Sequence, residues 1–130
     1  MPEVTAATAA ICALVLVAMS ADVAYQRRRH AVPLQGFGDN KHVNRAMRAH
    51  GNFTEHVPLA LLLLLVLELG ETSRPVLIAA GSTLVLGRLL HWYGLKTSSG
   101  MSFGRAFGVG ATWLVLVGEA LVLSSHVLAG

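Results

Sequence analysis

Four apolar stretches, each close to the length needed to cross a bilayer, restrict the folds open to this chain. They cover approximately residues 5–24, 43–69, 75–95 and 105–128. Twenty residues of α-helix rise about 30 Å, which is the thickness of the hydrocarbon core of a membrane. The sequence therefore predicts an all-α integral membrane protein, a single four-transmembrane-helix domain over residues 1–130.

The composition supports the membrane class. The chain is 54% hydrophobic and 13% charged, whereas soluble domains carry about 25% charged residues. The single cysteine, Cys12, excludes an internal disulfide and a cysteine-based zinc pattern. Because it lies in an apolar run, we interpret it as a small buried thiol, and we expect no metal site.

Basic residues border the apolar stretches, as topology determinants do, and do not form a basic helix suited to nucleic acid. Nine of the ten basic residues fall on the side of the first and third loops, namely Arg27, Arg28, Arg29, Lys41, Arg45, Arg48, Arg88, Lys96 and Arg105. Arg74 alone lies opposite. The positive-inside rule then places the basic loops in the cytoplasm and both termini outside, in what we expect to be a bacterial inner membrane. A cleaved signal peptide is the competing interpretation of the first stretch, but no positive residue precedes it.

A polar stripe opens the second stretch, directly before the apolar run 57–67. It consists of Arg45, Arg48, Asn52, Glu55 and His56. At about 100° per residue these five positions span an arc of roughly 100° on a helix. Polar and charged groups that enter a bilayer are costly and usually mark a functional site, so the stripe is the strongest functional signal in the chain.

Two other spans should add polar groups at a similar depth. Arg88 and His91 are three residues apart, so they share a helix face, and Arg105 opens the fourth span. Several arginines in a partly dry cleft indicate an anionic ligand, because guanidinium groups bind carboxylates through two hydrogen bonds. An amide and a carboxylate suit amino or peptide groups. A small anionic peptide fits this set, and so does a lipid headgroup phosphate.

Structural roles compete with these assignments. Arg45 could be a topology charge that extends to the headgroups. Arg48 and Glu55 could each pair with a neighbouring helix, and Asn52 could be a helix–helix contact. These alternatives stay open at the level of sequence.

The last span offers two further patterns. Gly104 and Gly108 have the small-xxx-small spacing that allows two helices to approach closely. Glu119 and His126 lie toward the other end of the span, and we interpret them as structural or exposed.

The segment 45–58, RAMRAHGNFTEHVP, resembles the second-helix signature of the MAPEG family, the membrane-associated proteins in eicosanoid and glutathione metabolism. The segment 88–91, RLLH, resembles a third-helix segment of the same family, and Gly94 fits the glycine that follows it. His91 and Leu95 stand where members of the family carry tyrosines. Chain length and four spans are similar throughout.

This resemblance implies a homotrimer that binds glutathione between neighbouring protomers, near the cytoplasmic face. It implies a glutathione-dependent transferase or peroxidase that acts on hydrophobic electrophiles from the membrane lipid. Arg105 would be the catalytic residue that stabilises the thiolate. The expected glutathione-binding residues are Arg45, Arg48, Asn52, Glu55, His56, Arg88 and His91.

Three other functions remain as alternatives. A non-catalytic, lipid-binding member of the same family would lack the chemistry but keep the fold. A small multidrug transporter also has four spans, yet it needs a membrane-embedded acid in the first span, where only Asp22 stands, near the end. A structural subunit of a larger membrane complex is the third.

Overall fold

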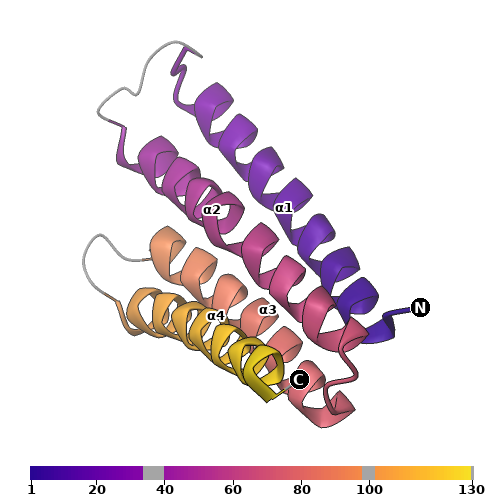
Figure 1. Cartoon of the computed structure of the whole chain (residues 1–130). Helices are drawn as coiled ribbons and strands as arrows, with labels where there is room; N and C mark the ends of the chain where they lie inside the picture. The colour runs from indigo at the N-terminus through magenta and orange to yellow at the C-terminus, as the bar shows by residue number, and fades with distance from the viewer. Residues whose placement is uncertain (34–39, 98–101, 130) are drawn as a thin grey trace.

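The computed structural model describes residues 1–33, 40–97 and 102–129. These residues form long α-helices, whose arrangement Figure 1 shows. They are α1 (Glu3–Arg29), α2 (Lys41–Leu69), α3 (Arg74–Thr97) and α4 (Phe103–Ala129), with no strand over the described residues. All four are long and apolar enough to cross a membrane. The predicted all-α architecture with four membrane-length helices is therefore confirmed.

The helices extend slightly beyond the predicted spans. α1 continues through Arg29, because the basic residues of its last turn interact favourably with the negative end of the helix dipole. α2 begins where the side-chain oxygen of Asn40 accepts hydrogen bonds from the backbone N–H groups of His42 (2.9 Å) and Val43 (3.2 Å). Pro75 lies in the first turn of α3, where the N–H group that proline lacks would have no partner within the helix. Residues 34–39 and 98–101 of the predicted loops lie outside the described residues.

The two central helices, α2 and α3, each contact all three other helices, whereas α1 and α4 do not contact each other over the described residues. The N-terminus lies at the same end of the bundle as the α2–α3 connection (Figure 1). We call this the terminal end, and we call the end where α2 and α4 begin the site end.

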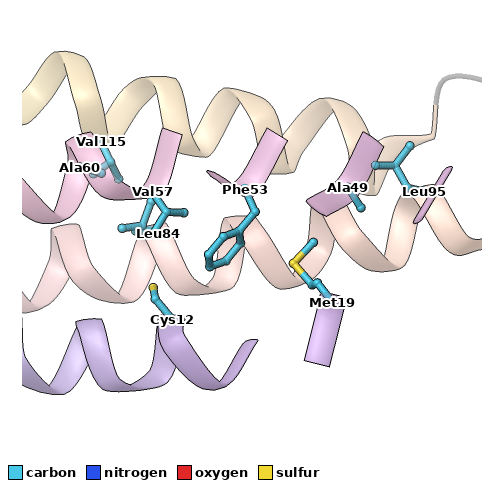
Figure 2. Packing of buried hydrophobic residues seen from close by; sticks show 9 residues of the cluster. All are labelled: Cys12, Met19, Ala49, Phe53, Val57, Ala60, Leu84, Leu95 and Val115. Carbon is cyan, nitrogen blue, oxygen red and sulfur yellow. The ribbon is translucent and has the colours of Figure 1, made fainter. Parts of the chain in front are cut away.

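The core is apolar and draws on every helix (Figure 2). Its main cluster of buried side chains consists of Cys12, Met19, Ala49, Phe53, Val57, Ala60, Leu84, Leu95 and Val115. Within the most apolar window of each helix only 22–33% of the residues are buried. Most apolar side chains therefore point outward, as they must if lipid surrounds the bundle.

Glycines bring α3 and α4 unusually close together. A Cβ atom added at Gly108 would lie 2.5 Å from the backbone oxygen of Gly87, and one at Gly104 would lie 3.0 Å from the backbone oxygen of Leu90. One added at Gly94 would lie 2.7 Å from the backbone nitrogen of Arg105. The predicted packing role of Gly104 and Gly108 is confirmed, and their contact fixes α4 against α3.

A carboxylate at the terminal end joins α2 to the start of α1. Glu68 accepts hydrogen bonds from the backbone N–H groups of Val4 (2.9 Å) and Thr5 (2.7 Å). These N–H groups belong to the first turn of α1, where no partner exists within the helix. Glu68 thus caps a helix from a position 63 residues away in the chain.

A second carboxylate, near the site end, joins α1 to α3. Asp22 accepts a hydrogen bond from the indole nitrogen of Trp92 (3.1 Å) and forms an ion pair with Lys96 (3.1 Å). The Lys96 ammonium also lies 5.0 Å from the centre of the Trp92 ring. The charge of Asp22 is therefore already neutralised within the bundle.

Candidate functional site

A polar cavity of about 730 Å³ opens at the site end, between α2, α3 and α4. Its volume falls within the range of about 300–1,000 Å³ typical of small-molecule sites. It is lined by Asn44, Met47, Arg48, Gly51, Asn52, Glu55, His91, Leu95 and Arg105. The predicted convergence of polar groups from three spans is present.

Helix α2 supplies most of the polar lining. Asn44, Arg48, Asn52 and Glu55 recur at spacings of three and four residues, so they share one helix face. Arg48 and Glu55 are exposed, and within the part of the chain that the structure describes neither takes part in an ion pair. Each can therefore engage a ligand without first breaking an internal bond.

Arg88 lies behind the cavity and fixes the orientation of Asn52. It is only 2% exposed, and its Nη1 donates to the Asn52 side-chain oxygen at 2.6 Å while its Nη2 donates to the backbone oxygen of Gly108 at 2.9 Å. Because Arg88 can only donate, the bonded atom of Asn52 must be the oxygen. The amide N–H groups of Asn52 are consequently the part of this side chain that a ligand can use.

His91 ties the end of α3 to the first turn of α4. It is 7% exposed, and its Nδ1 donates to the backbone oxygen of Arg105 at 3.3 Å. With Nδ1 acting as donor, Nε2 of the neutral ring is the acceptor. Together with the close approach at Gly94, this contact holds the backbone of Arg105 beside the cavity that both residues line.

The cavity lining does not include three residues expected to bind glutathione. Arg45 is half-buried outside it, Arg88 lies behind Asn52, and His56 donates from Nδ1 to the backbone oxygen of Asn52 on its own helix at 2.9 Å. The assignment of these three to a ligand stays a prediction.

Sequence reasoning missed part of the lining. Asn44 lies one helical turn before Arg48. Extending the three- and four-residue spacing of the stripe back by one turn would have found it. Met47 and Gly51 are uncharged and gave no such signal, and Leu95 stood out only through the family tyrosine that it replaces. At the terminal end, His126 is exposed, whereas Glu119 is 3% exposed and therefore buried.

The lining combines two guanidinium groups, two amides, one carboxylate and one imidazole. Such a set favours a compact ligand that carries several anionic groups together with an amine or peptide bonds.

The fold and this cavity define an integral membrane protein with four membrane-length helices, three of which build a polar cavity. Comparison with known sequences then identifies the family. A sequence model described as MAPEG family matches residues 5–124, and the chain belongs to the MAPEG family.

Two bacterial proteins that share one name are similar to this chain. "Inner membrane protein YecN" of Escherichia coli strain K12 is 33% identical over 114 residues, which cover 88% of this chain and 85% of the relative. The protein of that name from Escherichia coli O6:H1 matches to the same extent. With the four apolar helices, this similarity supports a multi-pass protein of the inner membrane.

Proposed function

We propose that this protein is a glutathione-dependent transferase that conjugates hydrophobic electrophiles taken from the bilayer. One observation supports the proposal above all. Cationic, amide and acidic side chains from α2, α3 and α4 converge on one cavity of small-molecule size. Glutathione, a tripeptide with two carboxylates, one amine and one thiol, presents the groups that this lining suits.

The residues that α2 contributes to the lining bind the parts of glutathione other than its thiol in this proposal. Arg48 binds a carboxylate of glutathione, the amide N–H groups of Asn52 bind its peptide oxygens, and Glu55 binds its amine. Arg88 is a positioning residue, since it touches the ligand only through the orientation that it gives to Asn52. Asn44 and Gly51 belong to the same face and complete the wall.

Arg105 supplies the catalytic charge. A thiol reacts as its thiolate, which a guanidinium group stabilises. The thiol proton passes to water, the thiolate sulfur forms a bond to an electrophilic carbon, and the leaving group departs with the electron pair of its broken bond. Binding both reactants in one cleft raises their effective concentration.

The proposal also covers the oligomeric state of the protein, its orientation in the membrane and the routes by which the two substrates reach the site. The protein acts as a homotrimer, with glutathione between neighbouring protomers, the basic loops in the cytoplasm and both termini outside. Glutathione enters from the cytoplasm and the electrophile enters sideways from lipid. The same thiolate can reduce a lipid hydroperoxide: its sulfur takes one peroxide oxygen as the O–O bond breaks, the lipid leaves as an alcohol, and a second glutathione then forms the disulfide and releases water.

Asp22 argues against a multidrug transporter. Such a transporter needs an acid in the first span that can exchange its partner. Here Asp22 accepts from Trp92 and pairs with Lys96, and its side chain is 9% exposed.

The test is conjugation of glutathione to 1-chloro-2,4-dinitrobenzene by purified protein in lipid nanodiscs. A Cβ atom at Gly51 has no atom within 4 Å, and Gly51 lines the cavity, so Gly51→Leu fills the site without disturbing the fold. Gly110→Leu is the matched control, because Gly110 is equally unobstructed but lies outside the lining. We expect conjugation by the wild type and by Gly110→Leu, and its loss in Gly51→Leu. An inactive wild type, or equal activity in the two variants, overturns the proposal.

A further inference from the structure

Glu119 on α4 is a buried carboxyl without a partner. It is 3% exposed, and neither of its side-chain oxygens has a hydrogen-bond partner among the described residues. Of the other acids that the structure describes, Asp22 and Glu68 are half-buried, and both have several partners. Unpaired polar groups are costly in an apolar interior, and acids inside a membrane span usually serve a function.

This carboxyl lines a second cavity, of about 230 Å³, between α2, α3 and α4. Apart from Glu119 and the hydroxyl of Thr83, the walls are apolar, and they include Leu64 and Leu67 near the end of α2 and Leu77 near the start of α3. The cavity therefore lies at the terminal end. Glu119 follows Arg105 by 14 residues on the same helix, about 21 Å along its axis, so this is not the glutathione cavity.

The second cavity opens toward the lipid-facing surface. Two of its lining residues, Val76 and Leu114, are 44% and 70% exposed on the apolar exterior. Gly118, next to Glu119, also lines it, and no atom lies within 4 Å of the position of its Cβ. A small group can thus approach Glu119 from the bilayer along Gly118.

The chain offers this carboxyl no counter-charge over the described residues. Among the described residues, two basic side chains lie at the terminal end. Arg74 pairs with Glu3 at 3.2 Å beside α1, and His126, two turns beyond Glu119 on α4, is exposed. We propose that the second cavity binds the amino group of a lipophilic amine, held by Glu119. The volume is below that of drug-sized sites, so it holds the amine end while the hydrocarbon tail stays in lipid.

Proton transfer makes this binding electrically neutral. A neutral amine arrives from the bilayer and takes the proton of the neutral Glu119 carboxylic acid. The nitrogen gains one proton, the carboxyl oxygen loses it, and an ammonium–carboxylate pair forms with no other bond changed. Because no net charge enters the membrane, the cost of burying a single ion is avoided.

A hydrophobic carbodiimide tests both whether Glu119 is accessible from lipid and whether an amine occupies the second cavity. N,N′-Dicyclohexylcarbodiimide reacts with protonated carboxyls in apolar surroundings, and mass spectrometry locates the adduct. We expect labelling of Glu119 in the intact protein in nanodiscs, slowed about tenfold by octylamine and unaffected by octanol. Equal protection by the amine and the alcohol refutes a site for amines, and absence of labelling refutes access from lipid.

Three variants test the site by calorimetric titration of octylamine. Glu119→Gln keeps the shape but removes the proton donor, and Gly118→Leu fills the cavity while the carboxyl remains. Gly110→Leu is the control on the same helix, outside the cavity. We expect the Kd for octylamine to rise about tenfold in the first two and to stay unchanged in the control. Wild-type affinity in Glu119→Gln overturns the proposal.

Discussion

The contact between α3 and α4 at Gly108 gives the most direct test of how the bundle positions its site. The substitution Gly108→Ala places a methyl carbon 2.5 Å from the backbone oxygen of Gly87 and 2.7 Å from the backbone nitrogen of His91. Ordinary contacts begin at 3.4 Å, so the two backbones must separate by about 0.9 Å. Forced shifts of this kind cost about 1–3 kcal/mol.

A matched control cancels the change in helix propensity that accompanies any replacement of glycine by alanine. Alanine favours a helix over glycine by about 0.5–1 kcal/mol, and this gain is common to Gly108→Ala and Gly110→Ala. Since a Cβ atom at Gly110 meets no atom within 4 Å, only the first variant carries the steric cost. The free energy of unfolding of Gly108→Ala should therefore be about 1–3 kcal/mol below that of Gly110→Ala.

The assay is reversible unfolding by sodium dodecyl sulfate in mixed micelles, followed by circular dichroism. The displacement should also reach the site, because the backbone oxygen of Gly108 accepts hydrogen bonds from Arg88 (2.9 Å) and Thr112 (3.0 Å). Two variants that differ in stability by less than about 0.5 kcal/mol would refute the close backbone contact.

Three further predictions concern single side chains. Arg105→Ala should lower kcat about 10- to 100-fold and change the Kd for glutathione much less, because the guanidinium acts on the thiolate; an unchanged kcat would remove Arg105 from the chemistry. Arg48→Ala should raise that Kd about tenfold, measured by calorimetry, and an unaltered Kd would count against the carboxylate contact. Glu68→Ala should lower the free energy of unfolding by about 1–2 kcal/mol in the same detergent titration, since the first turn of α1 loses two acceptors; no change would show that the cap is not formed.

Much of the fold follows from sequence because a bilayer leaves few choices. Apolar runs of spanning length predict helices, and the ends of α2, α3 and α4 lie within two residues of the predicted spans. The first helix runs five residues past its predicted end, because hydropathy marks where lipid ends and not where helical hydrogen bonding stops.

The sequence was enough to predict which face of α2 lines the candidate site, but not which side chains of the other helices that face meets. Helical periodicity placed Arg48, Asn52 and Glu55 together, and the structure brings His91 and Arg105 to the same cavity. Helical periodicity gives the direction in which a side chain points from its helix axis, but it does not give the residues of other helices that the side chain contacts.

The same limit applies to three residues whose contacts the sequence did not indicate. Arg88 lies behind the wall because glycines let α4 approach α3 there. The cap formed by Glu68 and the burial of Glu119 depend on contacts between distant segments, which no local pattern records.

The central claim is that one cavity formed by α2, α3 and α4 holds glutathione and stabilises its thiolate. The most direct measurement is the ultraviolet difference spectrum of the purified protein on addition of glutathione at neutral pH. The account predicts a saturable thiolate band in the wild type, with little of it in Arg105→Ala at saturating glutathione. Absence of the band in the wild type, or an equal band in the variant, would contradict it.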